Sequence, residues 1–260
     1  MVQAYSQALL REGVQVGDRI LIYLPCNIMM AEIILSCFDI GVIACPISTK
    51  MTKNELDVVI GNLQPRLIIT DWNEREKFKK QSFPLICIEE LLISSGGCSV
   101  FTNNYEKTLN DVCAIIFTSG TTGIPKAVQL TYKNFETSCN NWNNFLQFNI
   151  DDQFLCCLPL YHIGGLAVLI RALLYGFSIN LMHNFEEIDI QKTISTFPVT
   201  IISLVPTMLK RILEIDGGLA SLQLLRYILL GGGPCPKYLL DVCIREKLPI
   251  IKVYGMTETC

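Results

Sequence analysis

Residues 19–47 read RILIYLPCNIMMAEIILSCFDIGVIACPI and combine two short apolar runs with a longer helical pattern between them. The runs at 19–24 and 42–47 are continuous and β-rich, which is typical of strands buried on both faces of a parallel sheet. The residues between these runs predict a helix over 28–40, and Gly41 is placed to end that helix. This stretch therefore predicts a strand, a helix and a second strand, as in an α/β fold.

The same alternation continues through the rest of the chain. Further strands are expected to begin at residues 66, 84, 112, 153, 200, 226 and 249, and further helices are expected over 52–62, 129–147, 163–175, 186–196, 206–215 and 236–247. Thr52 and Glu55 have the spacing of a capping box. We therefore expect an α/β fold of mainly parallel sheets, with helices packed on both faces and right-handed crossovers. The aromatic residues of the helices at 28–40 and 129–147 are expected in the core.

One long polar stretch without a pattern, residues 94–110, predicts a surface linker between sublobes at 1–93 and 111–260. The chain opens within a helical pattern and closes at Cys260, within what looks like a functional loop. Natural domains usually end in a solvated tail or a docked element. We therefore expect a fragment of a larger protein.

The composition argues against several classes of protein. Half of the 260 residues are hydrophobic and 17% are charged, which argues against a disordered chain. The net charge of −3, with scattered basic residues, gives no electrostatic case for nucleic acid binding. The apolar stretches at 28–47 and 155–175 contain charged residues and proline, so they are interpreted as buried core rather than stable membrane insertions. The first residues lack the pattern of a secretory signal, and we expect a cytoplasmic protein.

The twelve cysteines have no CxxC spacing, and most of them lie within apolar runs. They are interpreted as small buried apolar residues rather than as a zinc or redox site. The two histidines, His162 and His183, are too few for a multi-histidine metal centre, and His183 is interpreted as structural.

The loop TSGTTGIPK at residues 118–126 has the composition of a phosphate-binding site. Four hydroxyl side chains, two glycines and one lysine follow a predicted strand within nine residues. Backbone N–H groups in such a loop can converge on an anion, and the lysine adds a positive charge. It is not a Walker A loop, because Pro125 precedes Lys126 and Ala127 follows it. Composition alone also allows a generic surface loop.

Two further stretches accompany this loop: a run ILLGGG that ends at Gly233 and a run VYGMTET at 253–259. In order and spacing, the three motifs resemble those of the adenylate-forming, or AMP-binding, superfamily. This resemblance implies the N-terminal core of such an enzyme without its small C-terminal domain. It also implies that ATP and Mg²⁺ activate a carboxylic acid to an acyl-adenylate, and that the acyl group then passes to CoA.

The resemblance also implies a role for each matching residue. The β- and γ-phosphates of ATP would be held by Thr118, Ser119, Gly120, Thr121, Thr122, Gly123 and Lys126. The adenine and the acyl group would lie against Gly231, Gly232, Gly233, Tyr254 and Gly255. Thr257 would touch the α-phosphate and Glu258 would bind Mg²⁺, a hard cation that prefers oxygen ligands. Taken alone, Glu258 is more often a solvated loop acid, and the glycine run is more often a turn between a strand and a helix.

His162 follows a predicted strand and precedes a glycine-rich helix start, where ligands bind in α/β sheets. Family members carry a histidine or an aromatic residue here, near the carboxylate and the pyrophosphate path. His162, Lys126, Thr257 and Glu258 are therefore the candidate catalytic residues. The alternative for His162 is a buried core histidine.

The stretch PLYHIGGLAVLIRALLYG at 159–176 is most similar to that of the o-succinylbenzoate:CoA ligases, which implies 2-succinylbenzoate as the substrate. A fatty or other aryl acid is the alternative. Relatives that activate amino acids usually carry an aspartate in the turn that residues 161–164 occupy here, where it pairs with the substrate's ammonium group. No aspartate is present in this turn, so an amino acid is disfavoured. Arg171 either serves a dianionic acid or is a structural ion-pair partner.

Relatives continue beyond the 253–259 motif with a ribose-binding aspartate and a catalytic lysine. We therefore expect little or no ligase activity from this chain alone. A catalytically dead nucleotide-binding protein is the rival interpretation, but the retained Lys126, Thr257 and Glu258 favour an enzyme.

Overall fold

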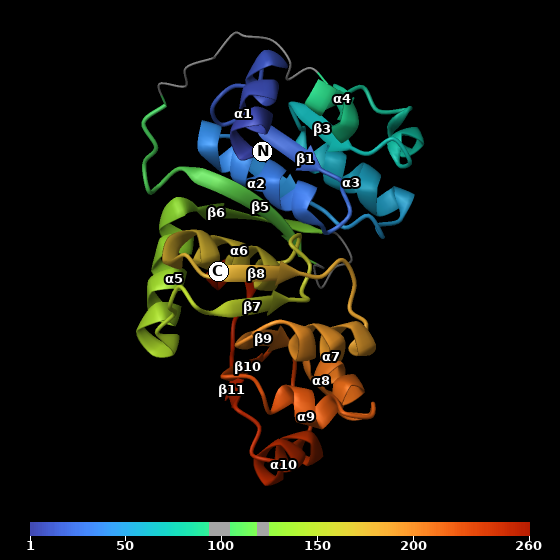
Figure 1. The fold of residues 1–260 in the computed structure, drawn as a ribbon. Coiled ribbons are helices and arrows are strands. Elements are labelled where there is room, and N and C mark those ends of the chain that lie inside the picture. The colour runs from blue at the N-terminus through green and yellow to red at the C-terminus, as the bar shows by residue number, and fades with distance from the viewer. Residues whose placement is uncertain (94–104, 119–124) are drawn as a thin grey trace. The chain divides into compact units, whose positions relative to one another are not determined.

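The computed structural model describes residues 1–93, 105–118 and 125–260, which form two compact units, Met1–Glu136 and Thr137–Cys260 (Figure 1). Each unit is built around its own sheet. The division differs from the expected sublobes at 1–93 and 111–260, because the strand that follows the 94–110 segment pairs with the first sheet. The fold class is as predicted, since helices alternate with strands and both sheets are mainly parallel.

The first unit contains a six-stranded sheet in the order β4-β3-β1-β2-β5-β6. Its strands are β1 (Arg19–Ile22), β2 (Ile43–Pro46), β3 (Leu67–Thr70), β4 (Leu85–Cys87), β5 (Val112–Thr118) and β6 (Lys126–Thr131). Neighbouring strands are parallel, except for β5 and β6, which form an antiparallel pair. The predicted phosphate loop therefore connects the two strands of this pair.

Helices cover both faces of the first sheet. They are α1 (Val2–Arg11), α2 (Ile28–Ile40), α3 (Lys53–Leu63), the 3-10 helix η1 (Arg75–Phe78) and α4 (Ile88–Ile93), and α5 (Tyr132–Leu146) begins in this unit and continues into the second. On one face, Leu21 and Ile68 pack with Leu56 of α3 in one apolar cluster. The alternate residues Ile20 and Ile22 are also fully buried. This burial on both faces confirms the interpretation of the continuous apolar runs.

The helix ends that the sequence predicts are present. Helix α2 ends at Gly41, which adopts the left-handed conformation. At the start of α3, the Thr52 hydroxyl accepts a hydrogen bond from the Glu55 N–H, and the Glu55 carboxylate accepts one from the Thr52 N–H. This reciprocal pair confirms the predicted capping box.

The predicted helix at 129–147 is wrong at its beginning. Residues 126–131 form β6, and α5 begins only at Tyr132. Two contacts fix this boundary: β6 pairs with β5 along its length, and the Thr131 hydroxyl accepts a hydrogen bond from the Asn134 N–H. A pairing partner that lies before the loop thus overrides the local helical pattern.

The second unit contains a five-stranded, wholly parallel sheet in the order β11-β10-β9-β7-β8. Its strands are β7 (Gln153–Cys156), β8 (Ser178–Leu181), β9 (Ile201–Leu204), β10 (Tyr227–Leu230) and β11 (Ile250–Lys252). The sequence prediction missed β8, a short edge strand whose four residues are exposed or only partly buried. The remaining elements are α6 (Ile163–Tyr175), α7 (Glu187–Thr196), α8 (Pro206–Leu213), α9 (Gly218–Leu222), α10 (Lys237–Arg245) and the 3-10 helix η3 (Thr257–Thr259).

The two faces of the second sheet are covered by different helices. Leu155 and Ile202 belong to a cluster that also includes buried residues of α7, α8, α9 and α10. Phe154, Ile201 and Leu229 belong to a second cluster with residues of α5 and α6. Figure 1 shows α7, α8 and α9 grouped beside β9 and β10. The predicted arrangement of helices on both faces is therefore confirmed for this sheet.

Of the cysteines that the structure describes, all except Cys235 and Cys260 are buried. Burial raises the pKa of the Cys157 thiol to about 12, so it stays protonated at neutral pH. These cysteines are small buried residues, as predicted. Within the described ranges, no helix is both long enough and apolar enough to cross a membrane.

Candidate functional site

A cavity of about 350 Å³ lies within the second unit and gathers several of the predicted site residues. Its walls include Gly231, Gly232, Tyr254 and Gly255, together with Arg171 of α6. These residues are far apart in the sequence and come from two of the motifs and one helix. The cavity is therefore the candidate site of this unit.

The topology of the sheet explains why these residues meet. Strands β7, β9, β10 and β11 are parallel, so their carboxyl ends lie at one edge of the sheet. The segment before α6, the glycine run and the 253–259 motif each follow one of these carboxyl ends. Ligands of open α/β sheets bind at this edge.

The local backbone requires glycine at two positions of the glycine run, and both positions lie in the cavity wall. A Cβ atom on Gly231 would come within 2.4 Å of a Val253 methyl carbon, a distance that real side chains do not tolerate. Gly232 has a φ of 76°, a left-handed conformation that favours glycine. The turn after β10 therefore requires both glycines and leaves bare backbone in the wall of the cavity. Gly233 is exposed and does not line it.

The 253–259 motif places its aromatic and acidic side chains in different surroundings. Tyr254 lines the cavity and is 93% exposed as a residue. Thr257 and Glu258 lie in η3 and are not part of the cavity wall, although Thr259 is. Glu258 is exposed and forms no ion pair with any described residue. A single free carboxylate fits Mg²⁺, which usually binds one or two carboxylates and keeps its remaining sites for water and phosphate.

His162 is the N-cap residue of α6, and its side chain makes no capping hydrogen bond. The residue as a whole is exposed, which argues against the alternative of a buried core histidine. It packs edge-on against Tyr161, with the ring centroids 4.7 Å apart. Desolvation by neighbouring protein atoms lowers the pKa of His162, so the imidazole is neutral at pH 7. The adjacent Ile163 and Gly164 line the cavity, whereas His162 itself does not.

Arg171 is the cation of the cavity wall and is only 6% exposed. It forms no ion pair with a carboxylate of the described residues, and its Nε–H is buried without a hydrogen-bond acceptor. Burial lowers the pKa of Arg171, because removal from water disfavours the charged form. The described residues thus offer no support for a structural ion pair. A buried cation without a partner carboxylate instead suits an anionic ligand.

Trp142 of α5 is a cavity residue that sequence reasoning assigned to the core. It lies beneath the guanidinium of Arg171, with the Arg171 Cζ atom 4.7 Å from the ring centroid. It also packs against the apolar cluster around Phe154, so its predicted place in the core is confirmed in part. Helical spacing places Ser138 and Trp142 on the same face, and both line the cavity. The four-residue spacing of these two residues is the sequence feature that could have placed Trp142 beside Ser138.

The predicted phosphate loop belongs to the first unit. Thr118 at the end of β5 lies directly opposite Lys126 at the start of β6. Ser119, Gly120, Thr121, Thr122 and Gly123 lie outside the described residues. Lys126 is exposed, so its ammonium group is accessible to an anion.

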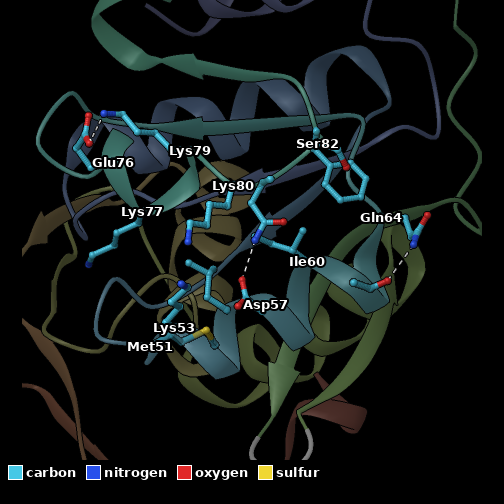
Figure 2. Close-up of a pocket in the computed structure, with 14 residues that line it drawn as sticks. Met51, Lys53, Asp57, Ile60, Gln64, Glu76, Lys77, Lys79, Lys80 and Ser82 are labelled. Carbon is cyan, nitrogen blue, oxygen red and sulfur yellow. Dashed lines mark hydrogen bonds and ion pairs between the residues drawn. The ribbon is translucent and has the colours of Figure 1, made fainter.

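A second hollow, of about 840 Å³, lies in the first unit beside α3 and the segment at 76–83 (Figure 2). It is the larger of the two but contains none of the predicted site residues. Two pairs of its polar side chains contact each other: Lys79 with Glu76, and the Gln81 amide with the Asp57 carboxylate. Exposed pairs of this kind contribute little energy. We interpret this hollow as a solvated surface groove.

Comparisons with known proteins identify the family. The AMP-binding enzyme family model matches residues 1–260. A 2-succinylbenzoate–CoA ligase of Bacillus cereus is 33% identical over 258 residues, which are 99% of this chain and 52% of the relative. The chain therefore spans about half the length of the curated relatives it matches.

Solved structures show the same likeness. The O-succinylbenzoate coenzyme A synthetase from Bacillus subtilis in complex with AMP superposes with a TM-score of 0.90 at 31% identity, covering 100% of this chain and 66% of that chain. The same synthetase in complex with ATP and a magnesium ion gives a TM-score of 0.87 at 30% identity, covering 100% and 54%.

Proposed function

This chain belongs to the AMP-binding enzyme family, and we propose that it joins a carboxylic acid to the α-phosphate of ATP and that the acyl group then passes from the acyl-adenylate to CoA. Pyrophosphate and then AMP are the leaving groups. The favoured acid is 2-succinylbenzoate, which is named in the Bacillus cereus relative and in the Bacillus subtilis synthetase. ATP and CoA are available in the cytoplasm, and we assign the reaction to that compartment.

The observation that carries the choice of acid is the buried Arg171. An acid with two carboxylates keeps one of them after the other is activated. That remaining carboxylate would satisfy the guanidinium in the cavity wall through charge-assisted hydrogen bonds. A fatty acid would instead leave a buried cation unpaired, which is costly. The chemistry of the cavity therefore favours a dianionic acid.

The family motifs carry the roles that we propose for the nucleotide. We assign the β- and γ-phosphates to the loop at 118–126, with the Lys126 ammonium neutralising charge that builds up as pyrophosphate leaves. We assign the adenine and the acyl group to the backbone at 231–233 and to Tyr254 and Gly255. Bare glycine backbone allows flat groups to approach closely.

Glu258 would hold Mg²⁺, which supplies neutralisation of the phosphate oxygens when bound. Thr257 would donate a hydrogen bond to the α-phosphate. The neutral imidazole of His162 would donate a hydrogen bond near the reacting carboxylate, where two anions must be brought together. These three roles rest on the family motif, and the exposure of Glu258 and His162 in the second unit supports them.

A thermal-shift experiment with non-hydrolysable acyl-adenylate analogues tests the proposal on this chain. The probes are the succinylbenzoyl, fatty-acyl and aminoacyl analogues, with AMP as the reference. Binding of such an analogue reports on the cavity without requiring turnover, and ligand at a hundredfold its Kd stabilises a protein by about 2.7 kcal/mol. We expect the succinylbenzoyl analogue to raise the melting temperature most.

A larger shift with the fatty-acyl analogue would overturn the choice of acid and keep the family chemistry. If no analogue shifts a cooperative melt more than AMP does, the acyl site itself is refuted.

A further inference from the structure

Two side chains from different helices form a cation–π pair in the wall of the cavity. Trp142 lies on α5 and Arg171 on α6, and the Arg171 Cζ atom is 4.7 Å from the centroid of the indole ring. Both residues line the cavity. Trp142 is half-buried and Arg171 is 6% exposed. Both side chains are therefore placed to contact a ligand in the cavity.

The indole ring offsets part of the cost of burying this cation. Within the described part of the chain, no carboxylate forms an ion pair with Arg171, and its Nε–H has no acceptor. A guanidinium over an aromatic face is attracted by the negative face of the ring, and this attraction grows when water is excluded. Trp142 thus stabilises the charge of Arg171 before any ligand binds.

Arginine guanidinium groups commonly stack on aromatic faces. The Arg171 Cζ atom lies over the indole ring, and a guanidinium carries its N–H donors around its edge. A carboxylate binds a guanidinium at this edge, through two parallel hydrogen bonds. The two interactions therefore use different parts of the group and are compatible.

We infer that Trp142 is a positioning residue that sets the specificity of the cavity. It holds the Arg171 guanidinium so that the edge of this group binds the carboxylate that is not activated. The inference rests on the proposed function, and it extends that function to a residue of α5 that does not itself react. Discrimination between acids with and without a second carboxylate should therefore depend on both Trp142 and Arg171.

The test uses two matched acyl-adenylate analogues and isothermal titration calorimetry. One analogue is the succinylbenzoyl compound, and the other has hydrogen in place of the carboxylate that is not activated. The readout is a ratio: the dissociation constant of the analogue without the second carboxylate divided by that of the succinylbenzoyl analogue. Loss of packing weakens both ligands together, whereas loss of the oriented guanidinium weakens the first ligand only.

We expect Trp142→Leu to reduce this ratio by about fivefold or more, and Trp142→Phe, which keeps an aromatic face, to reduce it less. Phe145→Leu is the matched control, because Phe145 lies on the same helix, is 66% exposed and does not line the cavity. That variant should keep the ratio of the unmodified chain.

A series of fluorinated tryptophans at position 142 tests the inference even if the Trp142→Leu variant does not fold. The chain has two tryptophans, Trp72 and Trp142, so Trp72→Phe leaves Trp142 as the single site for fluorotryptophans. Fluorine withdraws electron density from the ring face with little change in shape. The ratio should fall stepwise as the number of fluorine atoms rises.

An unchanged ratio across the fluorinated series would overturn the inference, as would equal losses for both analogues in Trp142→Leu. The proposed function fails in a different way. If the unmodified chain binds the two analogues equally and Arg171→Met changes neither, the cavity does not recognise a second carboxylate at all.

Discussion

Gly231 lies directly against Val253, so that a Cβ atom at Gly231 would come 2.4 Å from a methyl carbon and 3.0 Å from the carbonyl oxygen of Val253. This close approach joins the glycine run after β10 to the beginning of the 253–259 motif. Both residues line the cavity. Two motifs that are separate in the sequence therefore form one continuous piece of cavity wall.

The first prediction follows from this contact. Gly231→Ala should lower the free energy of unfolding by about 1 to 3 kcal/mol, because the added methyl group overpacks the contact with Val253. Urea unfolding measures the change. Gly233→Ala is the matched control, since a Cβ at Gly233 meets no atom within 4 Å. Equal losses in the two variants would contradict the close-approach account.

The Asp152 carboxylate holds together three segments of the second unit. It accepts hydrogen bonds from Arg226 Nη2 at 3.1 Å, Thr200 Oγ1 at 2.8 Å and the Asn149 N–H at 3.0 Å. Its side chain is 2% exposed. Asp152→Ala should therefore lower the free energy of unfolding by about 3 kcal/mol, because three partly buried donors lose their acceptor.

The matched control for Asp152 is an exposed ion pair. Lys210 and Glu214 lie 3.5 Å apart, with side chains 52% and 60% exposed. Glu214→Ala should cost no more than about 0.5 kcal/mol in the same urea titration. A loss for Asp152→Ala as small as this would show that the buried cluster is not stabilising.

The third prediction concerns pH. The pKa of His162 is lowered in the folded protein, so below about pH 6.5 the unfolded chain takes up a proton more readily than the folded one. This histidine therefore contributes stability above its unfolded pKa, and the contribution is lost as the pH falls through the folded pKa. The melting temperature of the unmodified chain should drop more steeply than that of His162→Gln over this window.

His183→Gln, measured in parallel, controls for the loss of an imidazole elsewhere in the second unit. If the melting temperatures of the unmodified chain and His162→Gln fall in parallel from pH 7.5 to 5, the desolvation of His162 is refuted.

The fourth prediction concerns magnesium. Glu258 is an exposed carboxylate in η3 that forms no ion pair within the part of the chain the structure describes. If it holds Mg²⁺, the ion should tighten ATP binding to the unmodified chain, and Glu258→Gln should remove most of that gain. Calorimetric titration of ATP with and without Mg²⁺ measures the difference. AMP affinity without metal is the control and should stay unchanged, whereas a full Mg²⁺ effect in the variant would exclude Glu258 as a ligand.

Local sequence signals predicted much of the fold. The capping box of Thr52 and Glu55 and the helix end at Gly41 depend only on neighbouring residues, and both are present. The continuous apolar runs predicted burial on both faces of each sheet. Strand β6 was missed because its pairing partner β5 lies before the loop, and β8 because an edge strand has a weak apolar pattern.

Only those residues of the site that belong to sequence motifs could be predicted. The glycine run and the 253–259 motif pointed to the wall of the cavity, and the structure brings Gly231, Gly232, Tyr254 and Gly255 together there. Arg171 was left between two roles, and Trp142 was assigned to the core. A contact between α5 and α6 has no signature in either helix alone, since it depends on how both pack against the sheet.

Arg171→Met gives the most direct test of the account, because it removes the buried charge and keeps a long apolar side chain. Calorimetry with the succinylbenzoyl-adenylate analogue should show a loss of about 2 to 5 kcal/mol, or roughly thirtyfold or more in Kd. The matched analogue without the second carboxylate should bind both proteins alike. Equal affinity of the unmodified chain and Arg171→Met for the succinylbenzoyl analogue would contradict the account, since the cavity would then recognise its acid without Arg171.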